Sequence, residues 1–158
     1  MAITGFLSIP DIAGESTNAE HAGEIDVFGL RWDVEQTSSA SIGRIRGRSR
    51  AVRGPVVVHK VLDAASPYIA DATHRGKTFQ EVVLTISKFT NDIRLDYLIL
   101  TMENVTFSAY EVVNESTDTD DMQLLERIEI DSGRMTLKYI VQNHGASDGD
   151  EHEVKFNY

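Results

Sequence analysis

Residues 93–109 read IRLDYLILTMENVTFSA, and this stretch carries the strongest structural signal in the chain. Apolar residues stand at every second position on either side of a break at Glu103–Asn104. They are Ile93, Leu95, Tyr97 and Ile99 before the break, and Val105, Phe107 and Ala109 after it. A period of two places alternate side chains on one face of a strand. Because the stretch exceeds the usual strand length of roughly 3–10 residues, we predict two β-strands here.

A second alternating region, residues 124–141, predicts a β-hairpin. The polar sequence Asp131-Ser132-Gly133-Arg134 separates its two apolar runs. The first run holds Leu124, Ile128 and Ile130, and the second holds Met135, Leu137, Tyr139 and Val141. A short glycine-containing segment between two alternating runs is typical of a hairpin turn. Near the C-terminus, Val154, Phe156 and Tyr158 predict one further strand.

Four more strands are predicted nearer the N-terminus, at residues 3–9, 25–34, 55–62 and 79–88. In the second of these the apolar phase shifts by one residue. It runs first through Ile25 and Val27, and then through Phe28, Leu30, Trp32 and Val34. A one-residue slip turns a strand's buried face outward, so we predict a bulge or bend near Phe28-Gly29.

One helix is predicted between Ser66 and Gly76. Ser66 suits the N-cap, Pro67 suits the first turn, and Gly76 suits the C-terminal cap. About nine strands with one short helix indicate a mainly β protein. We therefore predict a single domain over residues 1–158, a small antiparallel β-barrel or sandwich with one short α-helix packed on its side.

The composition excludes several classes of protein. The absence of cysteine excludes disulfide frameworks, Cys-ligated metal centres and thiol catalysis. With 15 Lys+Arg and 25 Asp+Glu, the formal net charge is −10, which argues against general binding of nucleic acid. Without a long apolar run or a basic leader, we expect no membrane insertion and no cleaved signal peptide.

Three groups of residues resemble functional motifs only in part. Gly76-Lys77-Thr78 ends like a phosphate-binding loop but lacks the first glycine and follows a helix instead of a strand. The acidic stretches 114–121 and 148–153 lack the spacing of a calcium loop and are predicted to be solvated loops. The five histidines never form a two-His helical pair, so each is expected to be a surface or hydrogen-bonded residue. We predict no catalytic, cofactor-binding or metal-binding residues.

Five arginines within ten positions form the most unusual local feature: Arg44, Arg46, Arg48, Arg50 and Arg53. The first four would share one face of an extended chain. Such a face could bind phosphates, dock on an acidic surface of another copy, or remain solvated. Residues 111–158 carry 12 acids and 4 bases and so supply an acidic partner. This favours self-association over nucleic acid.

The opening segment resembles the N-terminus of the Hcp family, the haemolysin-coregulated proteins that form the inner tube of bacterial type VI secretion systems. The matching residues are Ile12, Gly14, Glu15, Ser16, His21, Glu24, Ile25 and Trp32. A second match covers the family's strand, helix, Gly-Lys corner and following strand. Its residues are Asp63, Ser66, Pro67, Gly76, Lys77, Leu84, Thr85 and Ile86. Order and spacing agree over roughly residues 1–142.

The resemblance implies a small barrel that forms homo-hexameric rings. The rings stack into a tube that a contractile sheath expels, with a spike protein at its tip and small effector proteins in its channel. It implies a structural carrier that is not an enzyme and needs no cofactor. The chain would be cytoplasmic before firing and then secreted, and its length leaves no room for a fused C-terminal effector domain.

The arginine stretch aligns with the family's extended loop, which reaches toward the neighbouring ring. We therefore expect Arg44, Arg46, Arg48, Arg50 and Arg53 to take part in ring stacking. Their candidate acidic counterpart is Glu115, Asp118, Asp120 and Asp121. The alternative function is a small β-barrel binding module that uses the same arginines to hold a polyanion or nucleic acid.

Overall fold

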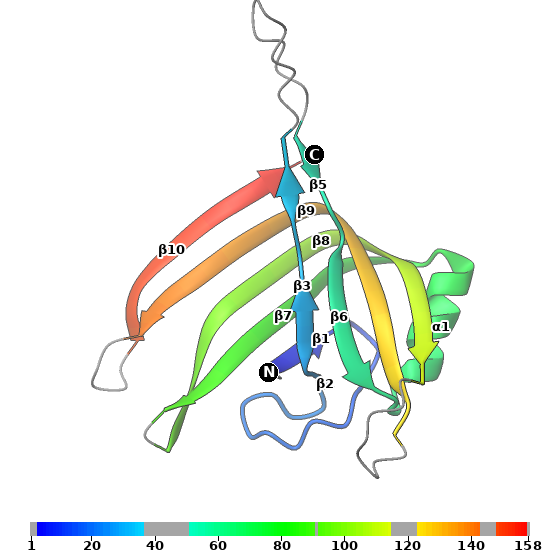
Figure 1. The fold of residues 1–158 in the computed structure, drawn as a ribbon, viewed down its shortest axis with the longest axis horizontal. Helices are drawn as coiled ribbons and strands as arrows, with labels where there is room; N and C mark the ends of the chain where they lie inside the picture. The colour runs from blue at the N-terminus through cyan, green and yellow to red at the C-terminus, as the bar shows by residue number, and fades with distance from the viewer. Residues whose placement is uncertain (1–2, 37–50, 91, 115–122, 143–147, 158) are drawn as a thin grey trace, which may run out of the picture.

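The structure is a computed structural model that describes residues 3–36, 51–90, 92–114, 123–142 and 148–157. Ten strands and one helix lie within the described residues (Figure 1). They are β1 (Thr4–Ser8), β2 (Ile25–Val27), β3 (Gly29–Arg31), β4 (Val34–Glu35), β5 (Val52–Arg53), β6 (Val56–Val61), α1 (Ser66–Arg75), β7 (Thr78–Thr90), β8 (Ile93–Val113), β9 (Leu125–Gln142) and β10 (Asp148–Asn157). The predicted fold class, mainly β with one helix packed on the side, is confirmed.

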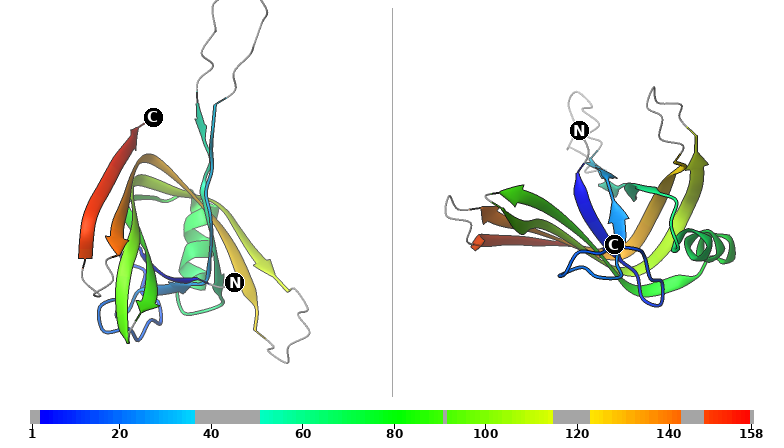
Figure 2. Two further views of the ribbon diagram at one scale, coloured as in Figure 1. Left: turned by 60° about the vertical axis from the view of Figure 1, so that its left-hand side comes forward. Right: turned by 90° about the horizontal axis from the view of Figure 1, so that it is seen from below.

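One antiparallel sheet wraps into a nearly closed barrel in the order β2-β1-β7-β8-β9-β6-β3 (Figures 1 and 2). Its two ends meet at Phe28, the residue between β2 and β3. The Phe28 amide donates to the His59 carbonyl at 2.9 Å, and the Phe28 carbonyl accepts from the Ile3 amide at 2.9 Å. The predicted bend near Phe28-Gly29 is therefore confirmed, and it marks where the chain changes its partner from β1 to β6.

Both long alternating regions are single strands, so two predictions are wrong. Residues 93–109 lie within the continuous strand β8, and the predicted hairpin is the continuous strand β9. The Asp131–Arg134 segment pairs with β8 instead of turning, with Thr106 opposite Asp131 and Val105 opposite Ser132. The residues of this segment favour a turn, but β8 supplies backbone partners along the whole region, so the segment stays extended.

The interruptions in the alternation line up across three neighbouring strands. Buried positions change between odd and even numbers at Gln80–Glu81 in β7, at Glu103–Asn104 in β8 and at Asp131–Arg134 in β9. Glu81 pairs with Glu103, and Glu103 pairs with Arg134. We call these three segments the crease. Asn104 has a φ of 53°, a left-handed conformation that asparagine tolerates. The shared change of phase lets the three strands bend together while their buried residues still face one core.

The edge of β9 changes partner at the crease. Before it, β9 pairs with β6, and after it β9 pairs with β10. Between the two, Arg53 donates to the Ser132 carbonyl at 2.5 Å. The predicted final strand is longer than expected, because residues 148–153, predicted to be a solvated loop, belong to β10. We call β10 and the strand segments beside it, past the crease, the sheet extension.

The helix α1 lies beside β8 and buries Ile69 and Ala72 (Figure 1). Pro67 stands in its first turn, and Gly76 ends it with a φ of 65°, as predicted. Ser66 is not the N-cap: Ala65 takes that position without a side-chain cap. The Ser66 hydroxyl instead accepts from Lys60 Nζ at 3.0 Å and from the Asp63 amide at 2.9 Å.

Candidate functional site

Most of the predicted stacking residues lie outside the described residues. This applies to Arg44, Arg46, Arg48 and Arg50, and to the acidic set Glu115, Asp118, Asp120 and Asp121. Their predicted roles stay predictions. Arg53 is described, and its guanidinium turns back to the Ser132 carbonyl of β9. In an extended chain, side chains at odd and even positions point to opposite faces. The odd number of Arg53 therefore already distinguished it in the sequence from the four even-numbered arginines.

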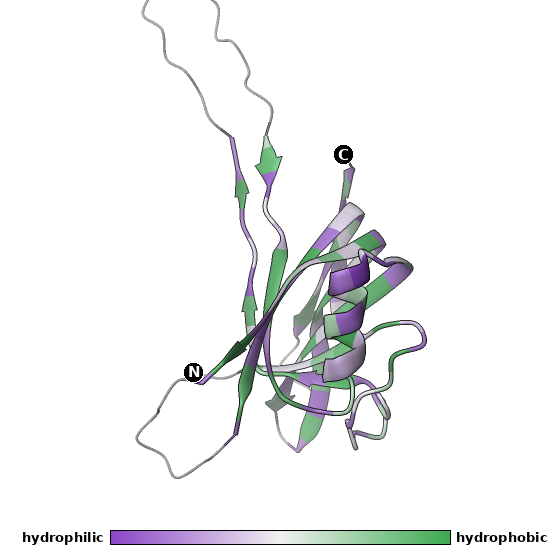
Figure 3. Cartoon of the chain, turned by 90° about the vertical axis from the view of Figure 1, so that its right-hand side faces the viewer, coloured by the Kyte–Doolittle hydropathy of each residue, from purple (hydrophilic) through white to green (hydrophobic). Residues whose placement is uncertain are grey.

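A two-stranded ribbon, β4 paired with β5, stands away from the barrel and leads into the arginine stretch (Figure 3). At its base the Gly54 amide donates to the Asp33 carbonyl at 3.0 Å. A Cβ on Gly54 would lie 2.1 Å from the Asp33 carboxylate, so a larger residue here would have to displace that side chain. Val34 and Val52 are exposed on the ribbon, with 50% and 67% of their surfaces accessible. An exposed apolar ribbon is suited to contact another molecule.

The sheet extension is the second exposed surface. Strand β10 pairs with β9, and within the described residues its other edge pairs with no strand. Apolar side chains are exposed along the extension at Phe89, Ile93, Tyr139 and Val154. Phe156 instead packs edge-on against Trp32 with ring centroids 5.5 Å apart. The extension thus offers both a free strand edge and apolar surface, the two features that proteins normally keep covered.

A buried charged cluster lies between β6, β9 and the start of α1. Lys60 Nζ donates to Glu126 at 2.8 Å and pairs with Asp63 at 2.9 Å. The Lys60 and Glu126 side chains are completely buried. The Tyr110 hydroxyl donates to the other Glu126 oxygen at 3.0 Å. Burial and this bond to a carboxylate raise the pKa of Tyr110 to about 12. Each charge in the cluster is paired with an opposite charge, so we interpret the cluster as structural.

A second polar cluster fastens the 10–24 segment to the outer face of the sheet. The His21 ring lies parallel to the Phe6 ring at 4.4 Å between centroids. Its Nδ1 atom lies 2.5 Å from Glu24, and its Nε2 atom lies 3.1 Å from Asp96. The Ser87 hydroxyl donates to the second Asp96 oxygen. The expectation that His21 is hydrogen-bonded is confirmed, but alternation alone did not reveal its partners, Glu24 and Asp96 of β8.

Within the described residues, no helix is long and apolar enough to cross a membrane. A sequence model of the family described as "Type VI secretion system effector, Hcp" matches residues 6–139. The chain is also 29% identical over 150 residues to protein hcp1 of Pseudomonas aeruginosa. That alignment covers 94% of this chain and 91% of the Pseudomonas protein.

Solved structures show the same fold. A type six secretion system protein has a TM-score of 0.88 and 22% identity, covering 98% of this chain and 95% of that one. Hcp1 from Salmonella typhimurium has a TM-score of 0.78 and 23% identity, covering 99% of this chain and 95% of that one. At such identities the likeness establishes the architecture, and the match of the family model establishes the family.

Proposed function

We propose that this chain, which belongs to the Hcp family of type VI secretion system effectors, is a structural subunit of the inner tube. Six copies form a closed ring, rings stack along an axis, and small effector proteins travel in the channel. The chain acts without catalysis or a cofactor. It is made in the cytoplasm and secreted with a tip spike protein by a contractile sheath.

The observation that carries the ring proposal is the exposure of β10. Val154 is 55% exposed in the middle of this strand, and the charged residues around it are exposed as well. The strand is held by one ladder to β9. A long edge strand with an unpaired side attracts further pairing unless something covers it. A neighbouring copy of this chain would cover it, and a head-to-tail contact that closes on itself generates a ring.

The ribbon of β4 and β5 supports the stacking proposal. It projects from the barrel away from the helix side and carries exposed valines at its tip (Figures 1 and 3). Six copies at −10 give 6 × −10 = −60 per ring. Like charges of this size oppose stacking unless local contacts are complementary. We therefore expect rings in dilute solution, and tubes at high concentration or within the secretion apparatus.

Two matched valine substitutions test whether β10 closes the ring and the ribbon of β4 and β5 stacks the rings. Val154→Lys places a charge on β10, whereas Val52→Lys places the same charge on the ribbon. Light scattering after size exclusion should give six times the 17.6 kDa chain mass for the parent and Val52→Lys. Val154→Lys should give smaller species, because the charge must be desolvated when rings close. A parent protein that is monomeric at every concentration would disprove the ring.

Charge reversal of Arg46 and Arg48 to Glu tests the stacking role of the arginines. Negative-stain imaging at low salt should show intact rings and fewer tubes than the parent forms. Unchanged tubes would remove the arginines from the stacking contact. Filter binding of nucleic acid over a salt series tests the alternative function. A steep loss of affinity with rising salt would favour the polyanion-binding module.

A further inference from the structure

His21 is held between two carboxylates, one at each ring nitrogen. Nδ1 lies 2.5 Å from Glu24, and Nε2 lies 3.1 Å from Asp96. The ring cannot turn freely, because it is stacked on Phe6 and its side chain is only 10% exposed. Asp96 is oriented in turn by the Ser87 hydroxyl, which donates to its other oxygen. The imidazole and the Asp96 carboxylate are therefore fixed in direction.

The Nε2 atom of His21 can serve as a metal ligand. A neutral imidazole carries one N–H, and the other nitrogen presents a lone pair. When the N–H is directed to Glu24, the lone pair of Nε2 faces an oxygen of the Asp96 carboxylate. A metal ion bound to both atoms removes the repulsion between these two electron pairs.

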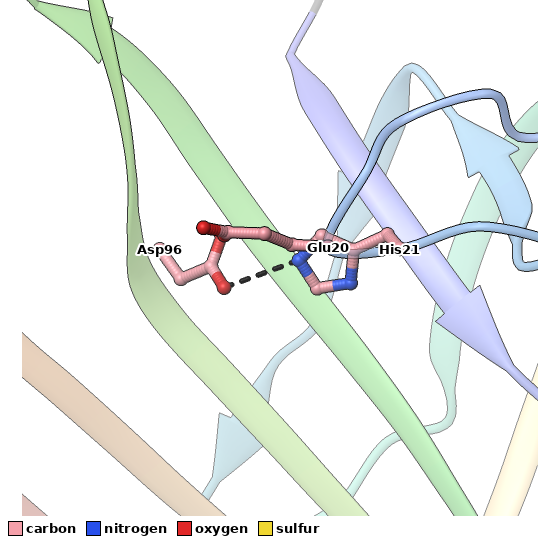
Figure 4. A group of neighbouring side chains, drawn as sticks. All are labelled: Glu20, His21 and Asp96. Atoms are coloured by element: carbon pink, nitrogen blue, oxygen red, sulfur yellow. Dashed lines mark hydrogen bonds and ion pairs between the residues drawn. The ribbon is translucent and has the colours of Figure 1, made fainter.

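A third ligand is present beside this pair. Glu20 carries an exposed carboxylate, and its oxygen, the His21 nitrogen and the Asp96 oxygen all lie within 4.8 Å of one another (Figure 4). No hydrogen bond or ion pair of the Glu20 carboxylate is found within the described residues, so it can turn to a ligand. Because Glu20 is exposed, an ion can reach the group from solvent.

We propose that Glu20, His21 and Asp96 bind a first-row transition-metal dication, with Zn²⁺ as the best fit. Zinc binds nitrogen and carboxylate oxygen at roughly 2.0–2.2 Å in a tetrahedral arrangement, which places neighbouring ligand atoms roughly 3.3–3.5 Å apart. Nε2 and the Asp96 oxygen are at a hydrogen-bond distance of 3.1 Å, so a small separation of the two atoms would give that spacing.

The groups behind the three ligands match the usual surroundings of a zinc site. A metal-binding histidine commonly donates its other N–H to a carboxylate, and Glu24 occupies that place. Ser87 supplies the corresponding contact to Asp96. The fourth coordination position is left to water. A bound ion would fasten the 10–24 segment to β8, because Glu20 and His21 lie in the first and Asp96 lies in the second.

Calorimetric titration of ZnCl₂ into the chelator-treated full chain tests the proposal. The decisive variant is Glu20→Gln, which removes an exposed ligand and leaves the His21–Asp96 contact in place. It should lose one equivalent of zinc per chain compared with the parent. The matched control is Glu111→Gln, which removes the same charge from an exposed position of β8 and should bind zinc like the parent.

Two further measurements test the surroundings of the site and its preference for zinc. Glu24→Gln should weaken zinc binding by about tenfold, the usual effect of losing a partner behind a ligand. Zinc should also raise the thermal midpoint of the parent, whereas Mg²⁺ should not, because Mg²⁺ demands six oxygen ligands. Equal zinc binding by the parent and Glu20→Gln, or no binding by the parent, would overturn the proposal.

Discussion

The two halves of β9 share β8 as the neighbour on one side but have different strands on the other side. Before the crease, β9 lies between β8 and β6 and buries Glu126, Ile128 and Ile130 completely. After the crease, it lies between β8 and β10; this half still buries Met135 but leaves Tyr139 exposed. The first half completes the core of one chain. The second half, on the proposed function, is completed by the next copy in the ring.

Two ion pairs, one in the first half of β9 and one at the crease, differ in the energy that they contribute. Lys60 and Glu126 are fully buried with 2.8 Å between their charged atoms. Arg134 and Glu103 are 3.3 Å apart, with 56% and 41% of their side chains exposed. Water screens the second pair, whereas the first has only protein partners around it. Breaking the two pairs should therefore have very different costs.

The largest effect is expected from Lys60→Met. The substitution leaves the Glu126 carboxylate buried without its main positive partner, which costs about 3–5 kcal/mol. Urea denaturation should show this as a lower midpoint with an unchanged slope. The double variant Lys60→Met/Glu126→Leu removes both charges and should regain much of the loss. A single variant as stable as the parent would contradict the buried pair.

Alternation along the chain already contained the signal for this pair. Lys60 follows Val56 and Val58 in the inward phase of β6, and Glu126 precedes Ile128 and Ile130 in the inward phase of β9. Two charges of opposite sign on inward phases predict a buried ion pair. Their pairing across the strands was not predictable, because the register of β6 against β9 depends on the whole sheet.

The predicted hairpin failed for a related reason. Reversal of phase at Asp131–Arg134 has two explanations, a turn or a bend, and composition favours the turn. The matching reversal at Glu103–Asn104 distinguishes them, since neighbouring strands of one bent sheet must change phase together. The extended conformation of the alternating regions, the helix and the bend at Phe28 could be predicted from local pattern, whereas the continuity of β8 and β9 could not. The edge of β10 that pairs with no strand among the described residues could not be predicted, because it depends on how the other strands pair after folding.

A smaller effect is expected from Tyr110→Phe, which removes one of the bonds to Glu126 in the buried half. Loss of a hydrogen bond to a charged group costs about 1–3 kcal/mol. The pKa of Tyr110 is raised from 10.0 to about 12. The folded chain therefore holds this proton more tightly than the unfolded chain. The resulting stability is complete below pH 10.0 and is lost as the pH rises to about 12.

Two measurements check the assignment of Tyr110. The difference in unfolding free energy between the parent and Tyr110→Phe should shrink over that alkaline range. In ultraviolet titration the folded parent should show one tyrosine that ionises late, and the variant should lack it. Tyr68→Phe on the exposed face of α1 is the matched control and should leave both results unchanged. A late tyrosine that persists in Tyr110→Phe would reassign the raised pKa to another residue.

The smallest effect is expected from Arg134→Met, which breaks the exposed ion pair at the crease as Lys60→Met breaks the buried one. Arg134 also donates to Asn157 of β10 at 2.8 Å, so the substitution removes two exposed contacts. Exposed pairs of this kind contribute about 0–1 kcal/mol, and salt weakens them further. Urea denaturation at low and high salt should show a loss below that of Tyr110→Phe, and high salt should abolish most of it. A loss as large as that of Lys60→Met would mean that the sheet extension is as tightly built as the barrel, and that β10 needs no neighbouring copy to hold it.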